Sequence, residues 1–281
     1  MTKKQMRQRH NLTRRIIQLV FFLFYPSLFT AAFTGVKYIF TQLGAGNALA
    51  LTSFVSVLLT LCIYTIVFGR FFCGYACAFG SFGDLIHGIY LTICKKLKKK
   101  PKKISAIASR RLSVIKYLLL AVILGACFFG TYGTFQYSPW DVFSMLTALK
   151  PRVQGYIIGW ILLLLIMIGM AVKERFFCRF LCPMGAVFSL LPVLPLFSLH
   201  RDRDNCRKGC RACTSCCPSE VELPARGAVE VSGDCFQCGK CTDTCPGGNV
   251  HTGIHIIKGN EIWFTILRAA ILIIICLVLN L

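Results

Sequence analysis

Acidic residues are scarce in this sequence, and so are the motifs of most enzyme classes. The chain of 281 residues carries 11 Asp and Glu against 32 Lys and Arg. It contains no nucleophile elbow, no phosphate-binding loop and no haem-binding C-x-x-C-H, which argues against the hydrolases, nucleotide hydrolases and c-type haem proteins that depend on them. Its basic residues do not alternate with aromatic ones as in a nucleic-acid groove. We therefore expect no nucleic-acid partner, despite a net charge of +21.

Long apolar runs are abundant instead. Hydrophobic residues make up 56% of the chain and the mean hydropathy is +0.64, which is too apolar for an ordinary soluble domain. A helix needs about 20 apolar residues to cross a bilayer. Four runs meet this requirement, at 16–36, 48–69, 113–133 and 155–172. A fifth run at 262–281 is weaker because Arg268 lies inside it. The first run is too long for a cleaved signal peptide.

The basic residues alternate between loops. Six Lys and Arg lie in residues 1–15 and ten in residues 70–112, whereas the two intervening loops contain three in total. Basic loops stay on the cytoplasmic side of a membrane. We therefore expect the N-terminus, residues 70–112 and residues 173–260 to be cytoplasmic. The lysine-rich segment 95–103 is placed to contact anionic headgroups.

Cysteine is clustered. Of the 17 cysteines, twelve fall into four tight groups, or thirteen if Cys216 is counted. All four groups lie on the predicted cytoplasmic side, where thiols are kept reduced and structural disulfides are rare. Metal binding or redox chemistry is therefore the better interpretation of these groups.

Two of the groups belong to one motif that occurs twice. RFFCGYACAFG at 70–80 and RFFCRFLCPMG at 175–185 each follow an apolar run and precede an apolar surface segment. Both copies lie on one side of the membrane, which predicts two parallel repeats. We therefore divide the chain into a basic tail (1–15), a membrane repeat (16–94), a basic linker (95–112), a second repeat (113–199), a cysteine-rich domain (200–258) and a fifth membrane helix (262–281).

The thiols of the repeated motif form a candidate joint site. Its members are Cys73, Cys77, Cys178 and Cys182. Residues i and i+4 share a helix face, so two opposed motifs offer four thiolates for an iron–sulfur centre, Cu(I) or zinc. Alternatively each pair cycles between dithiol and disulfide, or simply packs at a helix end. Three neighbouring cations would stabilise the thiolates: Arg70, Arg175 and Arg179.

The third group is an iron–sulfur signature. Residues 235–246 read CFQCGKCTDTCP, which places Cys235, Cys238, Cys241 and Cys245 in the spacing C-x2-C-x2-C-x3-C-P. In bacterial ferredoxins the first three cysteines of this run bind one [4Fe–4S] cluster and the fourth binds the other cluster. A zinc site would need neither the third cysteine nor the Cys-Pro pair.

The fourth group is a less regular copy of the same run. Residues 206–218 read CRKGCRACTSCCP, with Cys206, Cys210, Cys213 and Cys217 as the preferred ligands and Cys216 as an alternative to Cys206. If the two runs cross-ligate, one cluster takes Cys206, Cys210, Cys213 and Cys245, and the other takes Cys235, Cys238, Cys241 and Cys217. A domain of about 60 residues also needs such clusters to stabilise it.

Three polar residues near the membrane remain ambiguous. Asp84 and His87 share a helix face after the first motif, where they form either an interfacial polar face or a proton-exchange site for a quinone ring. Asp141 lies beside Trp140 on the outer side and is either a turn cap or an acceptor for released protons.

The combination of these motifs resembles the NapH-type membrane polyferredoxins, a group that includes MauN, the membrane part of NosR and the CcoG/RdxA proteins. The resemblance covers roughly residues 16–258 and is most specific at Cys178-x3-Cys182-Pro183, at Cys73 and Cys77, and in the cysteine-rich domain. The chain departs from the pattern at Ala78, where proline is frequent, in the widened gap after Cys206, and in its possible fifth helix.

The sequence therefore predicts a polytopic α-helical membrane protein with four or five transmembrane helices and a small cytoplasmic dicluster [4Fe–4S] ferredoxin domain. The resemblance implies electron transfer between the quinone pool, or a cytoplasmic donor, and a partner redox protein, as a quinol dehydrogenase component. Quinone is then a further expected cofactor. The alternative, suggested by the CcoG proteins, is a factor that reduces or delivers copper. Either function is expected at a bacterial or archaeal cytoplasmic membrane.

Overall fold

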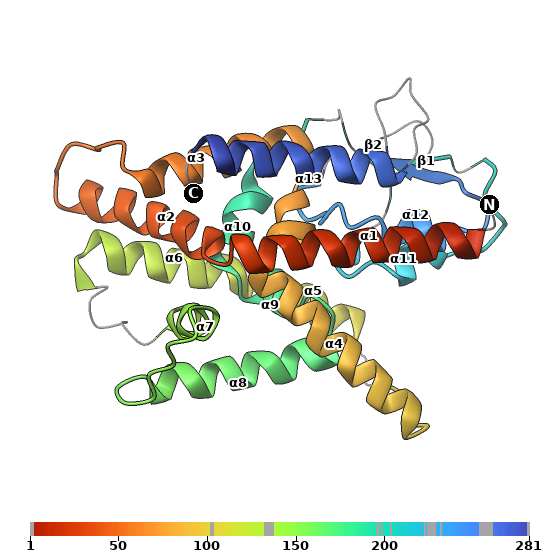
Figure 1. Cartoon of the computed structure of the whole chain (residues 1–281), viewed down its shortest axis with the longest axis horizontal. Coiled ribbons are helices and arrows are strands. Elements are labelled where there is room, and N and C mark those ends of the chain that lie inside the picture. Colours follow the sequence, from red (N-terminus) through yellow and green to blue (C-terminus); the bar gives the residue numbers. More distant parts are fainter. Residues whose placement is uncertain are drawn as a thin grey trace. The chain divides into compact units, whose positions relative to one another are not determined.

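The structure is a computed structural model that describes residues 3–101, 104–131, 138–194, 197, 199–202, 204–221, 223, 229–230, 232–252 and 261–279. Parts of the predicted tail, linker, outer loop, ferredoxin domain (253–258 among them) and fifth helix lie outside the described residues. The fold is mostly helical (Figure 1). Its elements are α1 (Lys3–Phe24), α2 (Leu28–Gly44), α3 (Ser53–Phe68), the π-helix η1 (Phe72–Ala76), α4 (Ala78–Lys96), α5 (Ala106–Leu112), α6 (Ile115–Phe128), α7 (Pro139–Thr147), α8 (Ile157–Val172), α9 (Phe176–Phe180), α10 (Pro183–Leu190), β1 (Leu199–Arg201), α11 (Ala212–Ser215), β2 (Val229–Glu230), α12 (Lys240–Thr244), β3 (Val250–Thr252) and α13 (Glu261–Val278).

Two of the described helical segments are long and apolar enough to cross a membrane, namely Ile107–Phe128 and Glu261–Val278. A third span results if α1 and α2, which are joined by a bend, count as one. Helices α3 and α8 are apolar but shorter. The segment predicted as the weakest span, α13, is thus among the clearest, and the chain is a helical membrane protein with two or three candidate spans.

The predicted run 16–36 is interrupted at Pro26. Helix α1 ends at Phe24 and α2 begins at Leu28. Pro26 has no N–H to donate, and its ring disfavours a helical conformation of Tyr25. The chain continues through a turn in which the Leu28 amide donates to the Tyr25 carbonyl oxygen at 3.4 Å.

The chain divides into two units. Unit 1 comprises Met1–Leu23, Cys62–Ala76 and Phe188–Leu281, and unit 2 comprises Phe24–Leu61 and Cys77–Val187. This division runs through the first predicted repeat. Cys73 belongs to the unit that contains the ferredoxin runs, whereas Cys178 belongs to the other unit.

Unit 2 is a helical bundle with an aromatic core. Helix α4 packs against α8, and α2 packs against α6. The sulfur of Met170 would lie 3.2 Å from a Cβ atom at Gly83, so glycine allows α4 and α8 to approach closely. Phe79 lies in the centre of the core, with ring centroids 4.1 Å from Phe177 and 4.4 Å from Phe143.

Unit 1 contains a small antiparallel sheet in the order β2-β1-β3. In the register Leu199 pairs with Thr252, and Arg201 with Val250. Leu199 and Val250 are buried on one side of this sheet, together with cysteines of the two ferredoxin runs. The short helix α11 carries Cys213, the short helix α12 carries Cys241, and the two helices pack against one another.

Candidate metal centre

In chain order, the first ferredoxin run is residues 206–218 and the second is residues 235–246. The second run turns tightly before α12. Gln237 (φ 51°) and Gly239 (φ 69°) both adopt left-handed backbone conformations, and glycine does so without steric cost. These two positions turn the chain between its cysteines, so that Cys238 and Cys241 return towards Cys235. Cys235 and Cys241 are buried, and Cys238 and Cys245 are half-buried.

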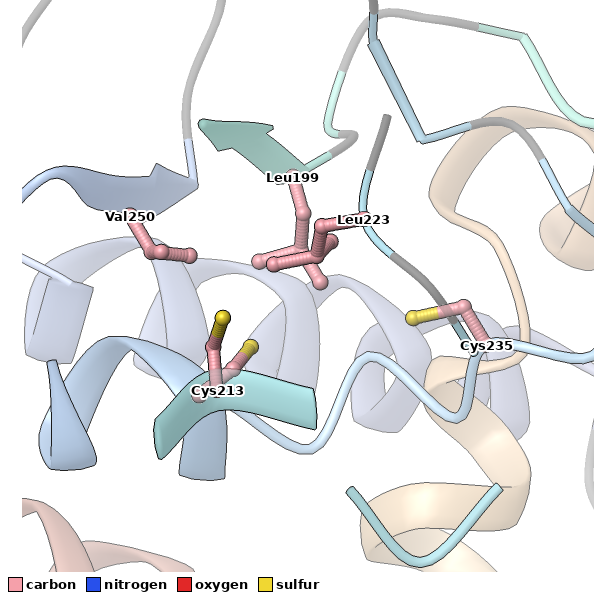
Figure 2. Close-up of a cluster of buried hydrophobic side chains, with 6 residues drawn as sticks. Leu199, Cys213, Leu223, Cys235 and Val250 are labelled. Carbon is pink, nitrogen blue, oxygen red and sulfur yellow. The ribbon is translucent and has the colours of Figure 1, made fainter. Parts of the chain in front are cut away.

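The turn leaves a hollow lined by thiols and apolar side chains. The thiols come from both runs and belong to Cys213, Cys217, Cys235, Cys238 and Cys241. Leu199, Val221, Leu223 and Phe236 are among the residues that complete the wall. Figure 2 shows the side chains of Cys213 and Cys235 pointing into the space that Leu199 and Leu223 cover. An apolar wall with a few thiols suits a group that is held by sulfur and shielded from water.

Cys217 lies with the thiols of the second run. Burial, with the Cys238 thiol nearby, raises the pKa of Cys217 to about 11. Burial likewise raises the pKa of Cys241, with further contributions from Cys238, Cys235 and Cys217. This neighbourhood is the one that cross-ligation requires, although the ligand assignment itself stays a prediction.

The remaining predicted ligands have a second neighbourhood. Arg201 interacts electrostatically with the thiols of Cys206, Cys213 and Cys210. Asn249 connects the two runs, since its backbone amide donates to the Cys245 sulfur at 3.2 Å and its side-chain amide lies 3.8 Å from the Cys206 sulfur. Cys245 thus lies beside the first run.

Cys216 is oriented differently from its neighbours. Its S–H donates to the Cys213 carbonyl oxygen at 3.3 Å, and burial raises its pKa. It packs against the core of the cysteine-rich region without lining the hollow. Cys216 also interacts electrostatically with the Cys238 thiol, so the choice between Cys216 and Cys206 as a ligand stays a prediction.

The thiols fit an iron–sulfur cluster better than a single ion. Among the described residues, no three His, Cys, Asp or Glu side chains converge on a point that could hold one metal ion. A cubane takes one thiolate at each of its irons, so its ligands surround a body instead of meeting at a point. The buried thiols would lose their protons on binding, because a coordinating thiol is deprotonated by the metal.

The first copy of the repeated motif (70–80) packs against the second ferredoxin run. Arg70 is buried, donates to the Gly233 carbonyl oxygen at 3.2 Å and lies 4.8 Å from the Phe236 ring centroid. A Cβ atom at Gly74 would overlap the Phe236 carbonyl oxygen. The Tyr75 hydroxyl donates to the Cys238 carbonyl oxygen at 3.3 Å. Buried Cys73 therefore lies in a segment that touches the second run on either side.

The second copy has a different partner. Arg175, also buried, donates to Asp84 at 2.5 Å and interacts electrostatically with the Cys178 thiol. The Cys182 sulfur accepts from the Gly185 amide at 3.1 Å. Cys77, Cys178 and Cys182 are all buried. Whether the four thiols of the two motifs form one site stays a prediction.

The sequences of the two copies differ where the ferredoxin run approaches. Gly74 of the first copy corresponds to Arg179 of the second. A side chain at this position is incompatible with the close approach of Phe236 seen at Gly74.

Comparison with known proteins gives the family. A model described as a 4Fe-4S binding domain matches residues 49–103 and 156–198. The ferredoxin-type protein NapH of Escherichia coli is 27% identical over 214 residues, which are 73% of this chain and 69% of NapH. The methylamine utilization ferredoxin-type protein MauN of Paracoccus denitrificans is 31% identical over 203 residues, or 68% of this chain and 65% of MauN.

The chain belongs to the NapH-type family of ferredoxin-like membrane proteins. An uncharacterized protein of Methanocaldococcus jannaschii, MJ0750, is 26% identical over 235 residues, which are 83% of this chain and 91% of that protein. The chain spans 65% of a second such protein, MJ0749, and 65% of MauN. No solved structure matches.

The matched segments of this NapH-type chain contain the two C-x3-C motifs and end before the first ferredoxin run. The similarity to a 4Fe-4S binding domain therefore falls on Cys73, Cys77, Cys178 and Cys182. The role of these four cysteines stays a prediction.

Two contacts of the ferredoxin region were not predicted. His10 on α1 is buried, and its Nδ1 lies 2.7 Å from Asp243 on α12. Its Nε2 lies 3.5 Å from the Tyr75 hydroxyl. Neither the spacing of His10 nor its neighbours in the sequence indicates a partner 233 residues away. The tail predicted as a basic extension is in fact packed through this residue.

The ambiguous polar residues are involved in packing. Asp84 is paired with Arg175, and His87 Nδ1 donates to the Ala171 carbonyl oxygen at 2.8 Å, so both connect α4 to the segment around α8. Asp141 accepts a 2.5 Å hydrogen bond from the Ser138 hydroxyl at the start of α7. The N-cap of α7 is Ser138, whose side chain accepts a hydrogen bond from the Asp141 amide, so Asp141 supports the capping residue and is not itself the cap.

Proposed function

We propose that this protein is a membrane-bound iron–sulfur electron-transfer protein with two [4Fe–4S] clusters in its ferredoxin runs. It links the quinone pool or a cytoplasmic donor to a partner redox protein. The family membership supports the iron–sulfur chemistry. The observation that carries the proposal is the thiol-lined hollow at the second run, seated on the residues around Cys73. When bound, the clusters would supply one-electron transfer.

The chain's own residues define a short route. Gly74 brings the backbone next to Cys73 into contact with Phe236, and Tyr75 holds the Cys238 carbonyl group. Cys235 and Cys241 are buried beside apolar side chains, which keeps water from the sulfur ligands. Electrons that reach Cys73 are thus separated from the second run by backbone contacts alone, without an intervening layer of solvent.

We further propose four or five spans, with the N-terminus and both ferredoxin runs in the cytoplasm. The alternation of basic loops supports this orientation. Reporter fusions after residues 105 and 230 should indicate a cytoplasmic location, and a fusion in the loop at 137–150 an external one. An external location of residue 230 would overturn the proposal, because the clusters would face the wrong compartment.

The composition and reduction of the purified protein test the function. Protein purified anaerobically should contain about eight irons and eight sulfides, and a quinol analogue should reduce it. Four irons, or no reduction by quinol or by a ferredoxin-like donor, would contradict the proposal. Cu(I) bound by the C-x3-C thiols, with no effect of deletion on quinol oxidation, would instead indicate copper handling.

Replacement of Cys73 and Cys178 tests the motifs. Either Cys73→Ser or Cys178→Ser should stop electron transfer from quinol while all eight irons are retained, and the double variant should be no worse. Cys62→Ser is the matched control, because Cys62 lies outside every cysteine group. Full electron transfer in the double variant would show that the motifs merely pack at helix ends.

A further inference from the structure

Arg268 is a buried cation in an apolar helix. It lies in the middle of α13, a candidate membrane span, and its side chain is only 2% exposed. Nε donates to the Phe264 carbonyl oxygen at 3.2 Å, but Nη1 has no hydrogen-bond partner among the described residues. Among the described residues no carboxylate lies within ion-pair distance of it, although the Glu261 carboxylate on the same helix interacts with it electrostatically. A charge buried in a membrane helix is costly and marks a functional site whose partner must be identified.

The surroundings of Arg268 lead to the second ferredoxin run. Its guanidinium lies 4.7 Å from the centroid of Phe71, and Phe71 stacks on Tyr75 with a centroid distance of 4.3 Å. The Tyr75 hydroxyl in turn donates to the Cys238 carbonyl oxygen. Arg268 also interacts electrostatically with the Glu261 carboxylate and, less strongly, with the Cys235 thiol. Two stacked aromatic rings therefore connect the buried charge to the second run.

A second guanidinium reinforces this charge. Arg70 is 1% exposed and lies over Phe236, the residue next to Cys235. Asp234 at 3.5 Å offsets part of the charge, but it is 49% exposed, so water screens it. The first run has no comparable pair among the described residues. Its nearest cation, Arg201, is only half-buried, and Arg207 and Arg211 are exposed.

We infer that Arg268 is the charge partner of the iron–sulfur cluster at Cys217, Cys235, Cys238 and Cys241, and that with Arg70 it raises the reduction potential there above that of the first run. This inference rests on the proposed function. Reduction adds one negative charge to a group that its thiolates already make anionic, so a fixed cation stabilises the reduced form. Net charge around a cluster is one of the determinants of its potential.

The expected shift is measurable. A single fixed charge in a medium with an effective dielectric constant of about 20 is expected to change the ratio of reduced to oxidised protein by about tenfold. For a one-electron couple, a tenfold change is about 59 mV. Burial protects this interaction from salt.

The test is a redox titration of the intact protein in detergent, followed by electron paramagnetic resonance. Arg268→Gln should lower the higher of the two midpoint potentials by about 59 mV and leave the other unchanged. Arg268→Lys, which keeps the charge, should restore most of the potential. Arg201→Gln is the matched control and should lower only the lower potential. Asp234→Asn should shift the higher potential upwards.

The outcomes separate this inference from the proposed function. If Arg268→Gln keeps eight irons and its potentials are unchanged, the inference is overturned and the proposed function is not. The same holds if Arg268→Lys lowers the higher potential as much as Arg268→Gln does. If Arg268→Gln loses iron, the inference is tested by two other variants. Arg70→Gln must lower the higher potential and Asp234→Asn must raise it. No shift, or shifts of one sign, would overturn the inference. Fewer than eight irons in the unmodified protein would overturn the proposed function as well.

Discussion

The two ferredoxin runs differ in how the rest of unit 1 holds them. The second run is contacted by Arg70, Gly74 and Tyr75 of the repeated motif and by His10 of α1. In the first run Cys206, Cys210, Cys216 and Cys217 are all half-buried, and only Cys213 is buried. The regular run thus packs against segments outside the ferredoxin region, whereas the irregular run packs through α11 against α12 and is contacted by Asn249. Regular spacing and close docking occur together, because a loop seated on other segments has less freedom to vary.

Replacing a ligand of the second run should have the largest effect. Cys238→Ala should remove one cluster, seen as a fall from about eight irons to about four, and should destabilise residues 200–258, because ligand binding is coupled to folding. The matched change in the first run is Cys216→Ala, which should keep eight irons because Cys216 points to the Cys213 carbonyl oxygen. Loss of four irons in Cys216→Ala would make it a ligand in place of Cys206.

The iron-free protein should lose stability at high pH, because buried thiols near the second run have raised pKa values. The pKa of Cys217 in the folded protein is raised from 9.0 to about 11. The neutral thiol is therefore favoured by folding, and this contribution is complete below pH 9 and is lost as the pH rises through about 11. Two pKa units correspond to about 3 kcal/mol.

The urea midpoint of the iron-free chain in detergent, followed by near-ultraviolet circular dichroism, measures this loss. Cys217→Ala should decrease the loss, although Cys241, whose pKa is also raised, preserves part of it. A midpoint that rises between pH 9 and pH 11 would contradict the burial of these thiols.

A smaller effect is expected from weakening the packing between the repeated motif and the second run. In Gly74→Ala the new methyl group meets the Phe236 carbonyl oxygen, and the backbone must shift, at a cost of about 2 kcal/mol. The urea concentration that bleaches the iron–sulfur absorbance should fall accordingly. Gly88→Ala in α4 is the control, because nothing lies within 4 Å of its added Cβ. Equal stability of the two variants would show that the motif and the run do not touch.

Much of this architecture could be predicted because its signals are local. Cysteine spacing reflects how one loop surrounds a cluster, and the length and polarity of a run indicate a membrane helix. The apolar run predicted at 16–36 is bent at Pro26, where the local signal was present in the sequence, and the two helices still count together as one candidate span. Asp141 was placed correctly beside a turn, but the residue that caps α7 is Ser138.

The packing of the second run against α1 and the repeated motif could not be predicted, because these contacts join segments that are distant in the sequence. His10 and Asp243 lie 233 positions apart, and Tyr75 and Cys238 lie 163 apart. No periodicity connects such pairs. Arg268 did leave a trace in the sequence, as a charge within an apolar run. That trace lowered the expectation of a membrane helix, whereas in the structure it marks a buried charge beside Phe71.

The pairing of Cys217 with the second run is the central claim about the site, and iron analysis of a double variant tests it most directly. If Cys217 and Cys238 bind one cluster, Cys217→Ala, Cys238→Ala and the double variant should each retain the same four irons and the same electron paramagnetic resonance signal. If each run instead held its own cluster, the two single variants would retain different clusters and the double variant would retain none. The predicted result is four irons in the double variant. A double variant without iron, when each single variant retains four irons, would contradict it.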